Sequence, residues 1–127
     1  MRRHVVIHRP AAEVWSLVGR PDRIHEWFPG ITSCRVDGEE RVVVTGAGVA
    51  MAERILTDDP LLRRFQYRIT APLFRDHLST LDVIELDAGS CMVVYGVDAE
   101  PAPLALVIAG AAGEALANLR QLMEGGL

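Results

Sequence analysis

The sequence predicts an α+β domain in which a curved antiparallel sheet of seven strands surrounds a long C-terminal helix, with two short helices after the first strand. Three observations predict this class. Apolar and polar residues alternate in short stretches between residues 31 and 99, with no helical stretch between them. From Leu104 to Glu124 the apolar residues follow helical spacing instead. Finally, a chain of 127 residues that is 50% hydrophobic suits a single domain, residues 1–127, with its own core.

The first thirty residues predict one strand and two short helices. Residues 3–8 alternate and are rich in β-branched side chains, which is typical of a strand. Pro10 favours the start of a helix, and Gly19 is expected to end it. A second short helix is predicted from Pro21 to about Trp27, before the stop at residues 29–30.

Six further strands are predicted between short turns. Because they follow one another at hairpin spacing, they should form an antiparallel meander. Only the C-terminal helix is long enough to cover the apolar face of such a sheet. The predicted strands span residues 31–37, 41–45, 51–57, 63–71, 74–86 and 91–99.

The C-terminal helix has a thin central part. Residues 109–113 are all alanine or glycine, so this part should leave volume against a wide sheet, with close helix–sheet packing as the alternative. Gly125-Gly126 is expected to end the helix. Its predicted apolar stripe comprises Leu104, Ile108, Ala111, Ala115, Leu119 and Leu122.

Composition argues against several functional classes. The net charge of −4 and the lack of a basic cluster argue against nucleic-acid binding. The apolar run Leu104–Gly113 is too short to span a bilayer, so no membrane insertion is expected. The N-terminus lacks the long apolar region of a signal peptide, which indicates a cytoplasmic protein.

No motif indicates a metal or a cofactor. Cys34 and Cys91 lie far apart and are expected to be buried free thiols. The sequence has no dinucleotide-binding glycine motif, P-loop or serine nucleophile elbow. The four histidines do not show the sequence spacing of metal ligands. They are His4, His8, His25 and His77.

Several short segments in order resemble the START/helix-grip (SRPBCC) superfamily. Residues 7–15 (IHRPAAEVW) and 27–31 (WFPGI) resemble its opening, and residues 53–55, 58–60, 67–69 and 116–119 sit where similar proteins carry comparable stretches. The likeness covers essentially the whole chain and is greatest to the small bacterial polyketide cyclase/dehydrase-like branch. It implies a helix-grip fold with a cavity between sheet and helix that binds a hydrophobic small molecule.

Period-two alternation sorts the strand residues into an inner and an outer face. Trp27 and Phe28 are interpreted as an apolar lip at the cavity mouth or as a staple between the short helices and the sheet. Ile108 and Ala111 are the expected helix contribution. Alternation puts inward Met51, Glu53, Ile55, Phe65, Tyr67, Ile69, Val93 and Tyr95, and the resemblance adds Arg75, His77, Ser79 and Leu81.

Glu53 and His77 are the candidate acid–base residues. An inward Glu53 would be desolvated and its pKa raised, unless His77 or Arg75 pairs with it. Such a carboxyl could accept or donate protons, and His77 could share the role. The alternatives are that Glu53 only pairs with an arginine at the rim and that His77 is a hydrogen-bonded wall residue. Tyr67 and Tyr95 are more typical of core than of catalysis.

Three functions remain open from the sequence. The first is a non-catalytic binder of a lipid- or polyketide-like molecule. The second, implied by the resemblance, is a polyketide cyclase/dehydratase-type enzyme in which Glu53 and His77, with Tyr67 or Tyr95, move protons. The third is a structural module with a side-chain-filled cavity that forms a homodimer through an exposed sheet edge.

Overall fold

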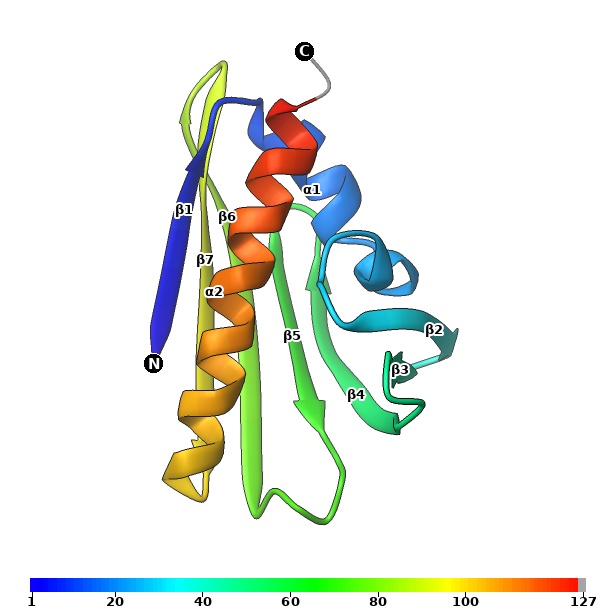
Figure 1. Cartoon of the computed structure of the whole chain (residues 1–127). Helices are drawn as coiled ribbons and strands as arrows, with labels where there is room; N and C mark the ends of the chain where they lie inside the picture. Colours follow the sequence, from blue (N-terminus) through cyan, green and yellow to red (C-terminus); the bar gives the residue numbers. More distant parts are fainter. Residues whose placement is uncertain (126–127) are drawn as a thin grey trace.

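The computed structural model describes residues 1–125 and confirms the predicted α+β class, with one long helix packed lengthwise against an antiparallel sheet (Figure 1). The two short helices after the first strand are an α-helix and a 3₁₀-helix. Observed and predicted element ends differ by a few residues at most. The elements are β1 (Arg2–Ile7), α1 (Ala11–Val18), η1 (Pro21–Glu26), β2 (Ile31–Asp37), β3 (Glu40–Thr45), β4 (Ala50–Asp59), β5 (Arg64–Ile69), β6 (Asp76–Asp87), β7 (Ser90–Glu100) and α2 (Ala102–Glu124).

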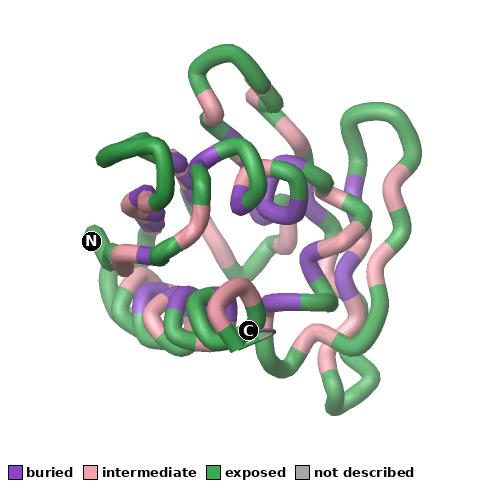
Figure 2. Tube along the Cα trace, turned by 90° about the horizontal axis from the view of Figure 1, so that it is seen from above, coloured by how far each residue is buried: buried purple, intermediate pink, exposed green. Residues whose placement is uncertain are grey.

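The sheet has seven strands in the order β1-β7-β6-β5-β4-β3-β2, and each neighbouring pair is antiparallel. Strands β2 to β7 form the predicted meander. The N-terminal strand β1 joins the far edge beside β7, where Val5 lies opposite Val93. Figure 2 shows that buried residues occur on both the strands and the helices, so sheet and helices share one core.

Helix α2 packs mainly on β7 and β1. The residues that it buries are Ala109, Ala112, Ala115, Leu116 and Leu119. The prediction of Leu122 in the buried stripe is wrong, because this side chain is about half exposed. The expectation for Gly126 lies outside the described residues.

The thin part of α2 is arranged differently from the prediction. Gly110 faces open space, and a Cβ at Gly113 would meet only the Arg3 side chain. The small side chain that borders the inner space is therefore Ala111. Both predicted alternatives are therefore found along the same helix. It packs closely on β7 and β1, and it leaves an open space further along the sheet.

Helix α1 ends at a glycine for a steric reason. A Cβ at Gly19 would overlap the indole of Trp15, so no side chain fits there without moving the ring. Cys91 is buried as predicted, but Cys34 is only half-buried, which corrects that prediction. Its thiol donates to the carbonyl oxygen of Asp22 at 3.0 Å and ties β2 to η1.

Helix α2 is also long and apolar enough to span a membrane. A core helix passes the same test, and five residues of α2 are buried in this structure. Two of its exposed apolar residues, Leu106 and Val107, lie near its N-terminal end, and Leu122 lies near its C-terminal end.

Candidate functional site

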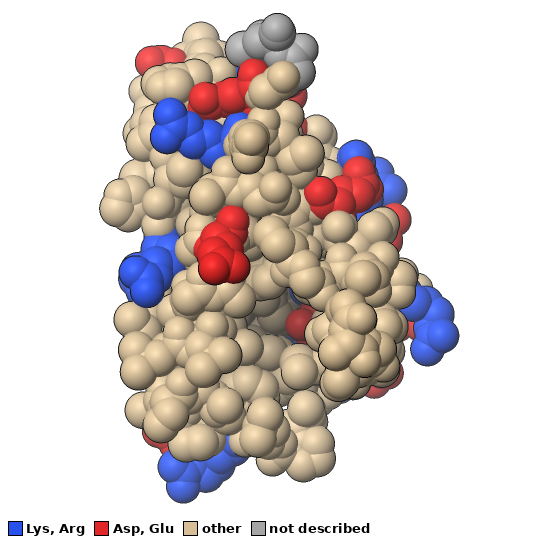
Figure 3. Space-filling view, in the orientation of Figure 1, with Lys and Arg blue, Asp and Glu red and all other residues tan. Residues whose placement is uncertain are grey.

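A cavity of about 160 Å³ lies between α2 and the strands β3, β4 and β5. It forms because α2 rests on β7 and β1, at one side of the sheet, while η1 and the start of β2 close the other side. Figure 3 shows a hollow beside α2 with acidic atoms inside it, and Glu53 is the acidic residue of the lining. The lining residues are Ile24, Phe28, Ile31, Val43, Thr45, Met51, Glu53, Tyr67, Ile69, Ile108 and Ala111.

The structure divides the predicted site residues into three groups. Six of them line the cavity, namely Met51, Glu53, Tyr67, Ile69, Ile108 and Ala111. Seven are buried in the surrounding core but do not line it, namely Trp27, Phe65, His77, Ser79, Leu81, Val93 and Tyr95. The inward placement of Arg75 is wrong, because its side chain is 76% exposed and pairs with Glu100 at 3.1 Å.

Glu53 forms a buried ion pair with Arg41, a residue that the sequence analysis did not single out. The two face each other across the β3–β4 hairpin, and Arg41 Nε donates to Glu53 Oε1 at 2.7 Å. Arg41 is 1% exposed and Glu53 is 5% exposed. The partner of Glu53 is thus neither His77 nor Arg75.

Arg41 is held by its surroundings on several sides. Its Nη1 donates to the carbonyl oxygen of Pro21 at 3.1 Å. Its guanidinium carbon lies 5.3 Å from the ring centre of Phe65 and 4.9 Å from that of Tyr67, within cation–π range. Within residues 1–125, Nη2 is buried without a hydrogen-bond partner. These contacts fix the guanidinium, which in turn fixes one oxygen of Glu53.

Burial raises the pKa of the Glu53 carboxyl above its ordinary value, and the charge and hydrogen bond of Arg41 act in the opposite direction. Oε1 accepts the Arg41 hydrogen bond, whereas Oε2 accepts none from the residues that the structure describes. Glu53 therefore offers the cavity one carboxylate oxygen that can accept a hydrogen bond or a proton.

His77 is fully buried, and both of its ring nitrogens have partners. The backbone N–H of Ile69 donates to Nδ1 at 2.9 Å, so the neutral ring carries its proton on Nε2, 3.0 Å from Ser79 Oγ. Burial lowers the pKa of His77 to about 4. At neutral pH the ring is uncharged, and it stands in the wall behind the cavity. Residues 1–125 contain no group of three His, Cys, Asp or Glu side chains placed to hold a metal ion.

A pair of tyrosines connects the cavity to the core. The hydroxyl groups of Tyr67 and Tyr95 share a hydrogen bond, and burial raises the pKa of both. Tyr67 lines the cavity, whereas Tyr95 is fully buried and packs against both Trp27 and Phe28. The shared bond keeps Tyr67 in one orientation at the cavity wall.

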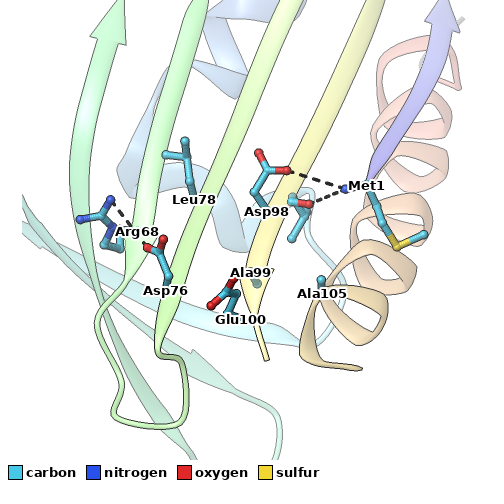
Figure 4. A pocket seen from close by; sticks show the side chains of 9 residues that line it. Met1, Arg68, Asp76, Leu78, Asp98, Ala99, Glu100 and Ala105 are labelled. Atoms are coloured by element: carbon cyan, nitrogen blue, oxygen red, sulfur yellow. Dashed lines mark hydrogen bonds and ion pairs between the residues drawn. The ribbon is translucent and has the colours of Figure 1, made fainter. Parts of the chain in front are cut away.

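Larger hollows lie on the outer face of the sheet. Figure 4 shows one of about 410 Å³, near the N-terminus. Four of its nine lining residues have charged, exposed side chains, namely Arg68, Asp76, Asp98 and Glu100. Arg68 lies 3.9 Å from Asp76, and the Met1 ammonium group donates to the Val97 carbonyl and lies 4.0 Å from Asp98. This hollow is a solvated surface and does not suit an apolar ligand.

The lining residues that sequence reasoning missed come mostly from η1, β2 and β3, and they include Ile24, Ile31, Val43 and Thr45. A signal for β3 was present. The turn Gly46-Ala47-Gly48 centres the hairpin on residue 47, so residues 41 and 53 are equally far from it. An inward Glu53 therefore implies an inward Arg41 directly opposite.

Comparison with known proteins identifies one family and one fold. The sequence model of the family described as "Polyketide cyclase / dehydrase and lipid transport" matches residues 1–124. No curated protein matches this sequence.

Solved structures resemble the chain over nearly its whole length. A Thermobifida fusca protein is 30% identical, with a TM-score of 0.77, over 98% of this chain and 94% of that one. A START superfamily protein from Mycobacterium smegmatis is 16% identical, with a TM-score of 0.82, over 100% of this chain and 98% of that one. The di-domain ARO/CYC protein BexL of the BE-7585A biosynthetic pathway is 19% identical, with a TM-score of 0.78, over 95% of this chain and 45% of that one. The helix-grip fold is thereby confirmed.

Proposed function

The chain belongs to the polyketide cyclase/dehydrase and lipid-transport family, and from this premise we propose that it binds a hydrophobic small molecule in the cavity between α2 and strands β3–β5. The observation that carries the proposal is the lining itself. Eight of its eleven residues are apolar, and Glu53, Thr45 and Tyr67 supply the polar groups. An apolar cavity with few, well-placed polar groups is the usual form of a small-molecule site.

The geometry of the wall supports the same proposal. The buried ion pair with Arg41 and the hydrogen bond between two tyrosines hold Glu53 and Tyr67 in fixed positions. Side chains fixed before the ligand arrives lose little conformational entropy on binding. The proposal therefore describes a largely preformed site and not one that must be opened by the ligand.

Filling the cavity tests this proposal. Ala111 lines the cavity, so Ala111→Leu places a larger side chain inside it. Ala117 lies on the exposed side of the same helix, so Ala117→Leu is the matched control. We expect toluene and related apolar probes to shift the NMR signals of cavity residues in the wild type and in Ala117→Leu, with affinity at least about tenfold lower in Ala111→Leu. Equal binding by all three proteins would show that the probes bind elsewhere and would refute the proposal.

A second candidate is an enzyme of the cyclase/dehydratase kind, favoured by the raised pKa of Glu53 at the cavity wall. In this reaction the carboxylate takes a proton from a carbon next to a carbonyl group of a short diketone. The resulting enolate carbon attacks the second carbonyl, and the new alkoxide receives the proton. Removal of a further α-proton and loss of the hydroxyl group as water then give a cyclic enone.

The two candidates differ in what Glu53→Gln does. A binder should keep its affinity for toluene and show no turnover in either form. An enzyme should convert a short diketone to the cyclic enone, and the glutamine variant should lose at least about a hundredfold in rate. Turnover that is unchanged in Glu53→Gln would exclude this carboxylate as the proton acceptor.

A further inference from the structure

The geometry points to a compact neutral ligand of about one ring in size, whose hydroxyl group donates a hydrogen bond to Glu53 Oε2. This inference rests on the binding function proposed above and names the chemical class of the ligand. It follows from the volume of the cavity, from the unused oxygen of Glu53 and from the charge balance of the wall.

The volume sets the size of the part of the ligand that is enclosed. The cavity measures about 160 Å³, whereas sites for drug-sized ligands span about 300–1,000 Å³. An apolar protein cavity of about 150 Å³ binds benzene. A single ring with one or two small substituents therefore fills the space between Ile108 and Ala111 on the helix and Tyr67 on the sheet. A chain long enough to form several rings does not fit inside it.

The unused oxygen sets the polarity of the ligand. Glu53 Oε1 accepts the Arg41 Nε hydrogen bond at 2.7 Å, and Oε2 has no donor among residues 1–125. Within residues 1–125, Oε2 is not one of the fully buried side-chain atoms that lack a partner, so it can be reached from the cavity. A ligand that supplies a donor to it gains a charge-assisted hydrogen bond. A hydrogen-bond donor is therefore favoured at this end of the cavity.

The charge balance makes a neutral donor the best fit. Arg41 already neutralises Glu53, so a cationic ligand would bring an uncompensated charge into an apolar cavity. An anionic ligand would face the carboxylate directly. Among residues 1–125, two buried donors lack partners, Arg41 Nη2 and Trp27 Nε1, and they belong to residues that do not line the cavity. Of the polar side chains in the lining, Glu53 thus carries the charge and a carboxylate oxygen without a donor, beside the hydroxyl groups of Thr45 and Tyr67.

The test compares p-cresol with toluene, which has nearly the same shape but no hydroxyl group. We expect calorimetric titration of the wild type to give p-cresol at least about tenfold tighter binding, as for a hydrogen bond to a charged acceptor. The signal of the Glu53 carboxyl carbon should shift in NMR spectra with p-cresol and not with toluene. Benzylamine and benzoate, the charged counterparts, should bind at least about tenfold more weakly than p-cresol.

Glu53→Gln should reverse the preference. If the amide oxygen keeps the Arg41 hydrogen bond, the amide NH₂ replaces Oε2 and offers the cavity a donor. The variant should lose its preference for p-cresol and gain affinity for the methyl ether 4-methylanisole, which can only accept. If Glu53→Gln does not fold, the comparison of p-cresol with toluene in the wild type alone still tests whether the ligand hydroxyl contributes to binding.

Each outcome has a distinct meaning. Equal binding of toluene and p-cresol would overturn the inference and leave the proposed binding function standing. Tighter binding of the two-ring 2-naphthol than of p-cresol would overturn the size argument. Failure of toluene, p-cresol and 2-naphthol alike would overturn the proposed function and, with it, this inference.

Discussion

Replacing Arg41 with methionine should lower the free energy of unfolding by about 3–5 kcal/mol at pH 7, because the change leaves Glu53 buried without its partner. The two side chains are 1% and 5% exposed, and the atoms that join them are 2.7 Å apart. A domain of 127 residues has a total stability of roughly 6–19 kcal/mol at about 0.05–0.15 kcal/mol per residue. The substitution should therefore remove a large share of the stability.

The loss should depend on pH through Glu53. Burial raises the pKa of this carboxyl above its ordinary value of 4.5, so the folded protein holds the proton more tightly than the unfolded chain. The stabilising effect of the bound proton is fully present below pH 4.5 and is lost as the pH rises through the folded pKa. Arg41 lowers this pKa, so Arg41→Met should raise it further. The destabilisation should thus be smaller at pH 4.5 than at pH 7.

Urea unfolding at pH 4.5 and pH 7 measures the free energies of unfolding. The proteins compared are the wild type, Arg41→Met and the double variant Arg41→Met/Glu53→Leu. The double variant removes both charges, so it should be more stable than Arg41→Met at pH 7. Titration of other groups cancels in the difference between variant and wild type. A cost below about 1 kcal/mol at pH 7, or the same cost at both pH values, would show that the pair is not buried and coupled as described.

Three further predictions concern the scaffold and the wall. Gly19→Ala should destabilise the protein by about 1–3 kcal/mol because the new Cβ meets an indole ring, whereas Gly110→Ala, in open space on α2, should stabilise it by about 0.5–1 kcal/mol. Thermal unfolding of both variants checks this prediction, and destabilisation by both would contradict it. Tyr67→Phe leaves the buried Tyr95 hydroxyl without a partner and should cost about 1–3 kcal/mol in urea unfolding, more than Tyr95→Phe; the reverse order would contradict the geometry. The pKa of His77 is lowered to about 4 from 6.5, so the folded state binds this proton less well than the unfolded chain does. The contribution of His77 to stability therefore falls as the pH drops from 6.5 towards 4. In urea unfolding, His77→Asn should lose less stability than the wild type over that range, and an equally steep loss would contradict a buried neutral ring.

The fold could be predicted because its signals are local and repeated. Alternation over residues 31–99 fixes which face of each strand is buried, and short turns leave antiparallel pairing as the simple connection. The pairing of β1 with β7 joins residues about ninety positions apart, and no local sequence pattern predicts this pairing. The errors lie where local patterns give no answer. Arg75 follows the irregular segment between β5 and β6, where alternation did not decide between the two faces. Its inward placement came from the family resemblance, and its side chain is exposed instead.

The cavity was harder to predict than the fold because it depends on where α2 lies. The sequence shows that residues 109–113 are small but not towards which strands they turn. In the structure Ala109 and Ala112 pack on the sheet, Gly110 faces open space and Ala111 borders the cavity. Ala111 is the smaller of the two helix residues that line the cavity, with Ile108, so enlarging its side chain narrows the site and is a sharp test.

Arg41 was missed because a charged residue contradicts the pattern that identifies an inner face. A buried ion pair usually adds little to stability and can often be replaced by apolar residues without loss. Every other ion pair in the part of the chain that the structure describes has at least one exposed partner. The one buried pair lies at the wall of the apolar cavity, with one carboxylate oxygen tied to Arg41 and the other without a donor. A departure from local rules is expected at a functional site, and the position of this pair supports the proposed role of Glu53 as the hydrogen-bond acceptor for a ligand in the cavity.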